Sequence, residues 1–213
     1  MTTIPEKEVL RYLRASESPD EAVLAQIREI STAFEKRVVP KCVYRETDLS
    51  VTDSTVSFDG YSFEGGDFYK HLHRCSSILL FAATLGVEAD RIVRTESARS
   101  MLRGSIAHAV GAAMIEQYCD DMQDELGKIY EDKGLYLRPR YSPGYGNLPL
   151  SFQKDFFRLL QPDKHLGISL SEHFTMTPSK SVTAIIGISN QKGKSFRKCL
   201  RCGNKECPFR REG

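Results

Sequence analysis

The chain has 213 residues, of which 40% are apolar and 27% charged, and its formal net charge is +2. These values are ordinary for a globular protein, and the length suits one domain with a small appendage. No run approaches the roughly 18 apolar residues of a membrane span, and the N-terminal stretch MTTIPEKEVLRYL is charged from Glu6 onward. We therefore expect a cytoplasmic protein without a membrane partner.

The N-terminal half predicts two helices followed by strands. Pro5 opens a short helix, and Ser-Pro-Asp at 18–20 provides a cap and an early proline for a second helix. Apolar residues at helical spacing over 23–34 place that helix on a core. β-Branched and aromatic residues between 38 and 61 indicate strands and a hairpin. The apolar run at 77–86 is the best candidate for a buried central strand.

The C-terminal half predicts the longest helix and further strands. This helix covers about 97–126 and is followed by an extended piece at 135–141. A helix at 149–160 and strand-like pieces near 166–177 and 181–189 complete the pattern. Because helices and strands mix without a regular βαβ alternation, we predict an α+β fold with a largely antiparallel sheet.

A turn-rich stretch, RPRYSPGYG at 138–146, contains residues suited to ligand binding. Its prolines favour extended backbone, and its glycines permit positive φ and close approach of another molecule. Arg140 offers a planar fork for a carboxylate or phosphate, and Tyr145 adds an aromatic face. This combination suits a ligand that is part carboxylate and part flat ring. The alternative is a rigid loop in which the arginine forms a salt bridge and the tyrosine packs.

Two blocks of sequence carry a resemblance to a known family. The pattern R-x-x-x-G-Y, formed by Arg140, Gly144 and Tyr145, is followed by GNLPLS and an amphipathic helix. The second block is LGISLSEHFTMTPSKSV at 166–182. In this order and separation, the blocks resemble the activation (reactivation) domain of cobalamin (vitamin B12)-dependent methionine synthase. The resemblance is clear over about 95–189.

The resemblance implies a C-shaped single domain of the α+β class, with a twisted, largely antiparallel sheet and flanking helices. We accordingly expect a methionine synthase activation-like domain at 1–189 and a basic, cysteine-rich tail at 190–213. In the family this domain is fused behind methyltransferase and cobalamin modules, neither of which is found in this chain. We therefore expect a stand-alone protein that acts on a separate methionine synthase or another corrinoid protein.

The resemblance also implies an accessory function. Domains of this family bind S-adenosylmethionine in a shallow groove and support the reductive methylation of cobalamin that has been oxidised to Co(II). The electron comes from a flavodoxin-like or ferredoxin-like donor, and the methyl group comes from S-adenosylmethionine. The cofactors carry the chemistry, while the domain positions the sulfonium above the cobalt. We therefore expect a reactivation component of a methyltransferase that contributes no catalytic residue of its own.

Four binding residues follow from the resemblance. It makes Arg140 the partner of the methionine carboxylate, lets Gly144 admit the ligand against the backbone, and places Tyr145 in the pocket wall. Glu116 falls where the family has a carboxylate on the long helix, which suits the ligand's ammonium or ribose hydroxyls. An exposed helical glutamate without a ligand is the alternative for Glu116. The family's tyrosine pair after the second block is absent, since this chain has NQKGKSF there.

The tail carries a cysteine cluster. Cys199, Cys202 and Cys207 form a C-x2-C-x4-C pattern followed directly by proline. Three thiolates at this spacing can hold zinc or an iron–sulfur cluster, and a flexible thiol-bearing tail is the alternative. A fourth ligand could come from a histidine, a partner residue or one of the three scattered cysteines, or the fourth position could stay open. We otherwise expect the scattered cysteines to be packing residues. The scattered cysteines are Cys42, Cys75 and Cys119.

Two other function classes remain open. Residues 189–213 contain eight Lys or Arg and two Glu, and this basic end allows a nucleic-acid-binding protein with a small zinc-binding element. Against that class, the tail lacks the second cysteine pair of a full zinc ribbon. A conventional small-molecule methyltransferase is disfavoured, because the N-terminal half contains no glycine-rich strand-to-helix turn.

Overall fold

The main sheet of the computed structural model has four strands in the order β1-β5-β9-β6, and every neighbouring pair is antiparallel. These strands are β1 (Lys41–Asp48), β5 (Ser77–Thr84), β6 (Tyr136–Leu137) and β9 (Ser181–Ser189). The structure describes residues 4–14 and 20–192. The run predicted at 77–86 forms an inner strand, and the predicted α+β class with an antiparallel sheet is confirmed.

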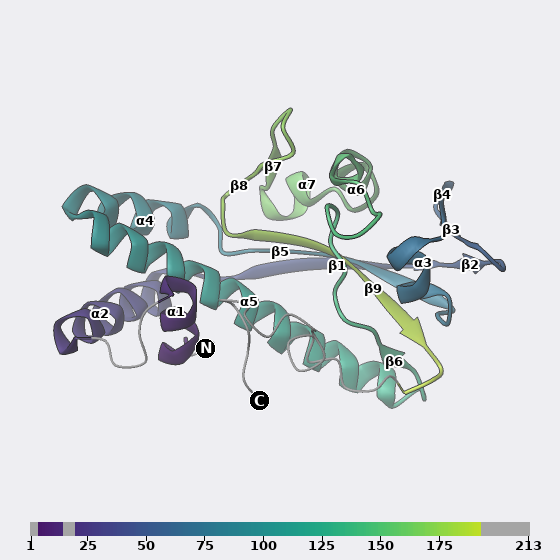
Figure 1. Ribbon diagram of the computed structural model, residues 1–213, viewed down its shortest axis with the longest axis horizontal. Helices are drawn as coiled ribbons and strands as arrows, with labels where there is room; N and C mark the ends of the chain where they lie inside the picture. Colours follow the sequence, from purple (N-terminus) through teal and green to yellow (C-terminus); the bar gives the residue numbers. More distant parts are fainter. Residues whose placement is uncertain (1–3, 15–19, 193–213) are drawn as a thin grey trace.

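Helices cover both faces of this sheet (Figure 1). The helices that share one core are α1 (Glu6–Leu13), α2 (Glu21–Arg37), α4 (Val87–Arg99) and α5 (Met101–Glu131). The others are α3 (Gly66–Leu72), a 3-10 turn η1 (Leu150–Phe152), α6 (Gln153–Leu160) and α7 (Pro162–Leu166). Two small antiparallel sheets contain β2 (Ser50–Val51), β3 (Thr55–Phe58) and β4 (Tyr61–Glu64), and β7 (Ser169–Leu170) with β8 (Met176–Thr177). Figure 1 shows α5 running beneath the sheet, with α6 and α7 above it.

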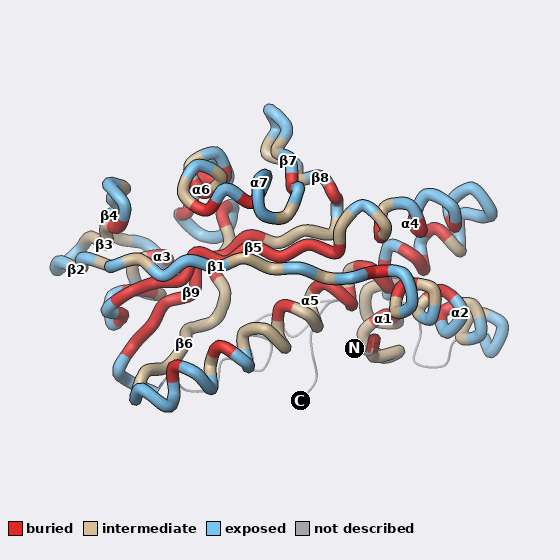
Figure 2. The backbone as a smooth tube through the Cα atoms, turned by 180° about the vertical axis from the view of Figure 1, so that it is seen from behind, coloured by how far each residue is buried: buried red, intermediate tan, exposed pale blue. Residues whose placement is uncertain are grey.

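The sheet separates two apolar cores. The first core lies against α1, α2, α4 and α5, and the second core lies against α3 and α6. The buried side chains of β5 alternate between them: Leu79, Phe81 and Ala83 belong to the first core, whereas Ile78, Leu80 and Ala82 belong to the second. Figure 2 shows β5 and most of β9 as continuously buried backbone. A strand that is covered on both faces has no polar face, which explains why the run SILLFAAT lacks alternation.

The long helix predicted at 97–126 is interrupted at Ser100, so the prediction of its start was wrong. Helix α4 ends one residue before Ser100, and α5 begins one residue after it and continues past the predicted end. Ser100 has extended backbone with φ −164°, and its Oγ accepts a hydrogen bond from the Arg103 amide at 3.1 Å. Ser100 is therefore an N-cap inside a stretch whose composition is helical throughout.

Other boundaries also differ from the predictions. Helices α3, α4 and α7 were not predicted, and the helix expected at 149–160 begins as the 3-10 turn η1 before it continues as α6. The cap of α2 is Asp20, whose carboxylate accepts a hydrogen bond from the Ala22 amide at 3.0 Å. Ser18 and Pro19 lie outside the described residues.

We expect Ser100→Ala to lower the free energy of unfolding by about 1 kcal/mol, because the Arg103 amide loses its acceptor. Urea denaturation followed by circular dichroism measures this change. Ser105→Ala is the matched control, since Ser105 is an exposed residue inside α5 and alanine is the better helix former. Equal stability of Ser100→Ala and the wild type would contradict the capping role.

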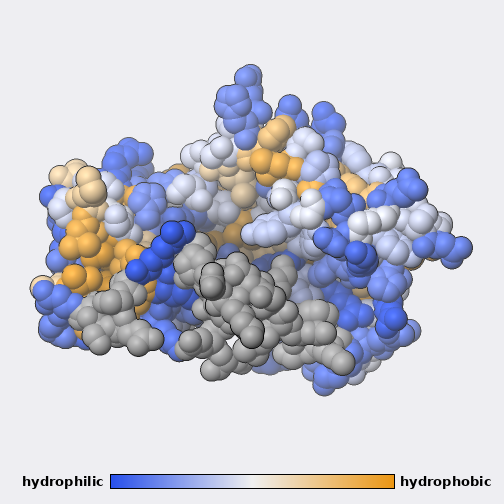
Figure 3. All heavy atoms as spheres, in the orientation of Figure 1, coloured by the Kyte–Doolittle hydropathy of each residue, from blue (hydrophilic) through white to orange (hydrophobic). Residues whose placement is uncertain are grey.

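The surface in Figure 3 is largely hydrophilic, with an apolar area over the end of the molecule where α4 and the first turns of α5 lie. At the start of α5, Met101 is 88% exposed and Leu102 is also exposed. No helix in the described part of the chain is long and apolar enough to cross a membrane.

Candidate functional site

The loop after β6 is fixed to β9 on both sides of Arg140. The Arg138 amide donates to the Gly187 carbonyl at 2.7 Å. The Tyr141 amide donates to the Ile185 carbonyl at 2.9 Å, and the Ile185 amide donates back to the Tyr141 carbonyl at 2.8 Å. Because the backbone before and after Arg140 is bonded to a buried strand, the sheet determines where this side chain meets α5.

Helix α3 contacts the same loop. His71 Nε2 lies 2.9 Å from the Pro139 carbonyl oxygen. Asn147 Oδ1 accepts a hydrogen bond from the Phe68 amide at 2.9 Å, and the rings of Phe68 and Tyr141 have centroids 5.2 Å apart. These contacts give His71 a role in holding the loop and tie the loop to the second core.

Arg140 contacts three polar side chains of α5. Its Nη2 lies 3.1 Å from Glu116 Oε2 and 2.7 Å from Asp120 Oδ1, and its Nη1 donates to Gln123 Oε1 at 3.2 Å. Spacings of four and then three residues place these partners on one face of the helix. Gln123 Nε2 also donates to the Arg138 carbonyl at 3.2 Å, so α5 bonds to the loop backbone as well. We call Arg140, Glu116, Asp120 and Gln123 the arginine cluster.

The arginine cluster is partly shielded from water. The side chain of Arg140 is 15% exposed, and those of Glu116 and Asp120 are each 37% exposed. Burial alone would lower the pKa of Arg140, but the negative charges of Asp120 and Glu116 outweigh burial and raise it. The guanidinium therefore stays cationic. Because it faces two carboxylates, the cluster as a whole carries an excess of negative charge.

The turn predicted to bind a ligand follows Arg140. Gly144 has φ +94° and Gly146 has φ +50°, a region of backbone conformation that favours glycine. A side chain at position 146 would also overlap the Tyr141 hydroxyl. Tyr145, between the two glycines, is 63% exposed. The glycines thus allow a tight turn that presents an aromatic ring at the surface.

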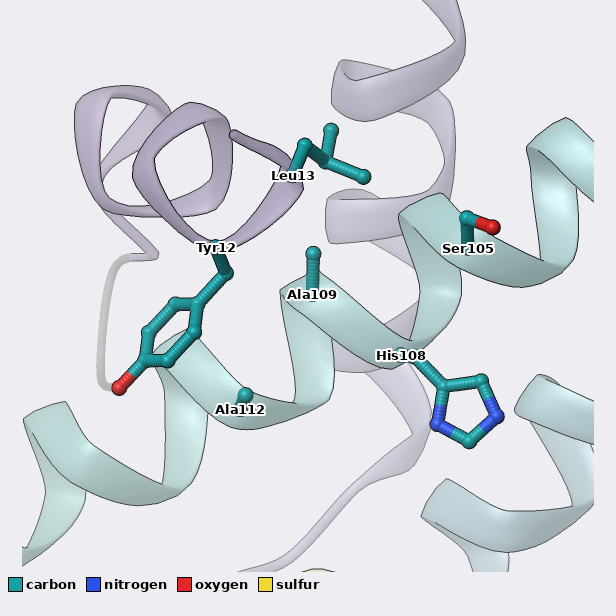
Figure 4. A pocket seen from close by; sticks show the side chains of 6 residues that line it. All are labelled: Tyr12, Leu13, Ser105, His108, Ala109 and Ala112. Atoms are coloured by element: carbon teal, nitrogen blue, oxygen red, sulfur yellow. The ribbon is translucent and has the colours of Figure 1, made fainter. Parts of the chain in front are cut away.

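An open hollow lies between α1 and α5 (Figure 4). Its volume is about 390 Å³, and its lining residues are Tyr12, Leu13, Ser105, His108, Ala109 and Ala112. Figure 4 shows the Tyr12 ring beside Ala112 and the His108 ring at the other end. Ala112 precedes Glu116 by about one helical turn, so the hollow and the arginine cluster follow one another along the same face of α5.

A family model matches the part of the chain that contains this arrangement. The model described as vitamin B12 dependent methionine synthase, activation domain, matches residues 67–205. The chain belongs to this family. The match to the activation-domain family includes the loop with Arg140, the face of α5 with Glu116 and the second sequence block. It begins upstream of residue 95, where the resemblance first became clear, and ends within the tail.

A solved activation domain has the same fold. The crystal structure of the MetH reactivation domain bound to AdoHcy matches with a TM-score of 0.62 and 17% sequence identity. The aligned part covers 82% of this chain and 66% of that chain, so this chain spans just under two thirds of the length of the solved protein. No curated protein sequence matches the chain. The structural likeness supports the α+β activation-domain fold and, at this identity, nothing finer.

The structure brings two of the four predicted binding residues together. Glu116 and Arg140 are in direct contact, whereas Gly144 and Tyr145 lie in the turn that follows Arg140. Asp120 and Gln123 were not predicted, and they lie four and seven residues after Glu116. This spacing was the available signal, since such residues share a helix face.

The predicted metal ligands Cys199, Cys202 and Cys207 lie outside the described residues. Within the part of the chain that the structure describes, no group of three or more His, Cys, Asp or Glu side chains is arranged to hold a metal ion. Cys119 is fully buried, and burial raises the pKa of its thiol to about 12. Cys119 is therefore protonated at neutral pH, which suits the packing role predicted for it.

Proposed function

We propose that this protein binds S-adenosylmethionine at the arginine cluster. The observation that carries the proposal is the contact of Arg140 with two carboxylates on α5, in a chain of the activation-domain family. The amino-acid end of the ligand has one carboxylate and one ammonium group. The cluster offers a guanidinium for the first and carboxylates for the second, so it is complementary to this zwitterion.

In this proposal, binding exchanges ion pairs within the cluster. The ligand carboxylate takes positions on Arg140 that now bond to Glu116 and Asp120, and the ligand ammonium bonds to those two side chains. Every charged group keeps a partner in both states, which avoids the cost of an unpaired charge in a partly buried site. Gly144 shapes the turn, and Tyr145 offers its ring to the nucleoside.

The proposed partner is a cobalamin-dependent methionine synthase, or another corrinoid protein, in its Co(II) state. Reductive methylation there consumes one electron, from a flavodoxin-like or ferredoxin-like donor, and one methyl group from S-adenosylmethionine. This chain contributes the position of the sulfonium, because holding two reactants together removes much of the entropy cost of their encounter. It therefore acts as an accessory component without a catalytic side chain of its own.

We assign this positioning to an activation-like domain at 1–189 and treat 190–213 as a separate tail. We place the protein in the cytoplasm. Cys199, Cys202 and Cys207 would hold zinc or an iron–sulfur cluster, and a cluster would suit a reaction that needs an electron. Neither the family match nor the structural likeness supports the alternative of a nucleic-acid-binding protein.

A reactivation assay tests the proposed function. Co(II)-form methionine synthase without its activation domain is mixed with a chemical reductant, S-adenosylmethionine and the full 213-residue chain. We expect methylcobalamin to form, as followed by visible absorption, only when the chain and S-adenosylmethionine are both present. Arg140→Ala should lose this activity, because the methyl donor is no longer held.

Two results would overturn different parts of the proposal. If the wild type binds S-adenosylmethionine but methylcobalamin does not form, the assigned partner is wrong. If the wild type does not bind S-adenosylmethionine at all, the assigned site is wrong.

A further inference from the structure

Gln123 is the one member of the arginine cluster to which the proposed function gives no group of the ligand. Arg140 takes the carboxylate of the ligand, and Glu116 and Asp120 take its ammonium. Gln123 is neutral, yet it contacts the guanidinium, since its Oε1 accepts a hydrogen bond from Arg140 Nη1 at 3.2 Å. This contact must therefore serve something other than charge pairing with the ligand.

The side-chain amide of Gln123 is fixed at both of its polar atoms. While its Oε1 faces the guanidinium, its Nε2 donates to the Arg138 carbonyl oxygen at 3.2 Å. A flip of the amide would turn its NH2 group toward a guanidinium, which only donates, and its oxygen toward a carbonyl, which only accepts. Because a flip loses both hydrogen bonds, the amide has one favoured orientation.

The same amide connects the guanidinium to the main sheet. The peptide of Arg138, whose carbonyl accepts from Gln123, also has its amide bonded to the Gly187 carbonyl in β9 at 2.7 Å. Gln123 itself is a half-buried residue of α5. One side chain thus joins the helix, the loop backbone and the tip of Arg140.

The exchange of partners in the proposed function leaves the contact with Gln123 intact. Glu116 and Asp120 both bond to Nη2 of Arg140, at 3.1 and 2.7 Å, and the ligand carboxylate takes these positions. Gln123 bonds to the other terminal nitrogen, Nη1. Because the guanidinium is planar, a partner that stays on Nη1 keeps the plane in place while the partners of Nη2 change.

We infer that Gln123 is a positioning residue that holds the guanidinium of Arg140 in the orientation that binds the ligand carboxylate. This inference rests on the proposed function and gives a role to a residue that the family resemblance did not identify. A neutral amide suits this role, because it accepts from the guanidinium without adding a third carboxylate that would compete with that of the ligand. Gln123 should therefore affect the binding of the carboxylate and not that of the ammonium, sulfonium or nucleoside.

Calorimetric titration of the full 213-residue chain with two probes tests the inference. The probes are S-adenosylmethionine and its decarboxylated form, which keeps the ammonium, sulfonium and nucleoside. We call the dissociation constant of the decarboxylated form divided by that of S-adenosylmethionine the carboxylate preference. We expect a value well above one for the wild type, and we expect Gln123→Met to lower it by about 3- to 10-fold through the lost hydrogen bonds.

The carboxylate preference separates positioning from a merely structural role. Methionine is about as long as glutamine and forms helices about as well, so α5 should be retained. A general loss of stability would affect both probes alike and cancel in the ratio. Gln123→Glu should also lower the carboxylate preference, because it places a third carboxylate on Arg140 and removes the donor to the Arg138 carbonyl.

A double-mutant cycle tests whether Gln123 acts through Arg140. In the Arg140→Ala background the carboxylate preference should be close to one, and adding Gln123→Met should not lower it further. If Gln123→Met lowers the preference by the same factor in this background, Gln123 acts on the ligand independently of Arg140 and the positioning role is refuted.

Gln117→Met is the matched control. Gln117 is another half-buried glutamine of α5, and its Nε2 donates to Asp121 of the same helix at 2.8 Å. It lies six residues before Gln123, a spacing that places the two side chains on different faces of the helix. Its substitution should leave the carboxylate preference unchanged. An equal decrease in Gln117→Met and Gln123→Met would contradict a specific role of Gln123.

The outcomes separate the inference from the proposed function. If the wild type prefers S-adenosylmethionine and Gln123→Met has the same preference, the inference is wrong while the binding site stands. If the wild type binds both probes equally or binds neither, the proposed site fails and the inference fails with it. Should Gln123→Met not fold, an unchanged preference in Gln123→Glu would overturn the inference.

Discussion

Arg140→Ala should weaken the binding of S-adenosylmethionine by about 10- to 100-fold, because charge-assisted hydrogen bonds to the ligand carboxylate each contribute roughly 1.5–3 kcal/mol. The loop itself should remain in place, since backbone hydrogen bonds to β9 hold it on both sides of this residue. Isothermal titration calorimetry measures the loss directly. Arg140→Lys keeps the charge but not the planar fork, so it should recover only part of the affinity.

Arg158→Ala provides the matched control for this loss. Arg158 lies on α6, its side chain is 75% exposed, and it pairs with Asp155 in the same helix. Its removal should leave the affinity for S-adenosylmethionine unchanged. If Arg140→Ala binds as tightly as the wild type while its circular dichroism spectrum is native, the ligand does not bind at the arginine cluster.

Phe68→Ala should lower the free energy of unfolding by about 3–5 kcal/mol, because a fully buried aromatic side chain is replaced by a cavity. The Phe68 ring packs against Phe63 and Tyr141, with centroids 5.1 and 5.2 Å away. Its amide also donates to Asn147 in the loop after Arg140. We therefore expect this substitution to destabilise the second core and the loop together, as measured by urea denaturation.

Tyr44→Ala provides a comparison with an aromatic residue of the surface. Tyr44 lies on the edge strand β1 and is 48% exposed, so its loss should cost less than about 1 kcal/mol. If the two substitutions destabilise the protein to the same extent, Phe68 does not carry the packing of the second core.

Local patterns predicted the elements whose signal lies within a few residues. The strand β5 was recognisable because both of its faces are buried, and α2 was recognisable because Ile27, Ile30 and Phe34 recur at helical spacing and are buried. The turn after Arg140 was recognisable because glycine favours the positive φ that Gly144 and Gly146 adopt there. In each case the residues that determine the conformation are the residues that adopt it.

The break at Ser100 could not be predicted in the same way. Ser97 lies inside α4 and Ser105 lies inside α5, so serine alone does not mark a boundary. The junction is stabilised by contacts across it and beyond it. Arg103 Nε donates to Glu96 at 2.5 Å, and the other nitrogens of Arg103 bond to Glu29 of α2. The position of the break therefore depends on how three helices pack.

The sequence by itself determined the family and the α+β class and drew attention to Arg140 as a candidate binding residue, because these signals lie in blocks of adjacent residues. It also placed acidic residues along the second half of α5, among them Glu116, Asp120, Asp121 and Asp124. Only the tertiary structure decided which of these acids meet Arg140. That choice depends on the hydrogen bonds of the loop to β9 and on the packing of α5 against the sheet, and both join segments that are far apart in the chain.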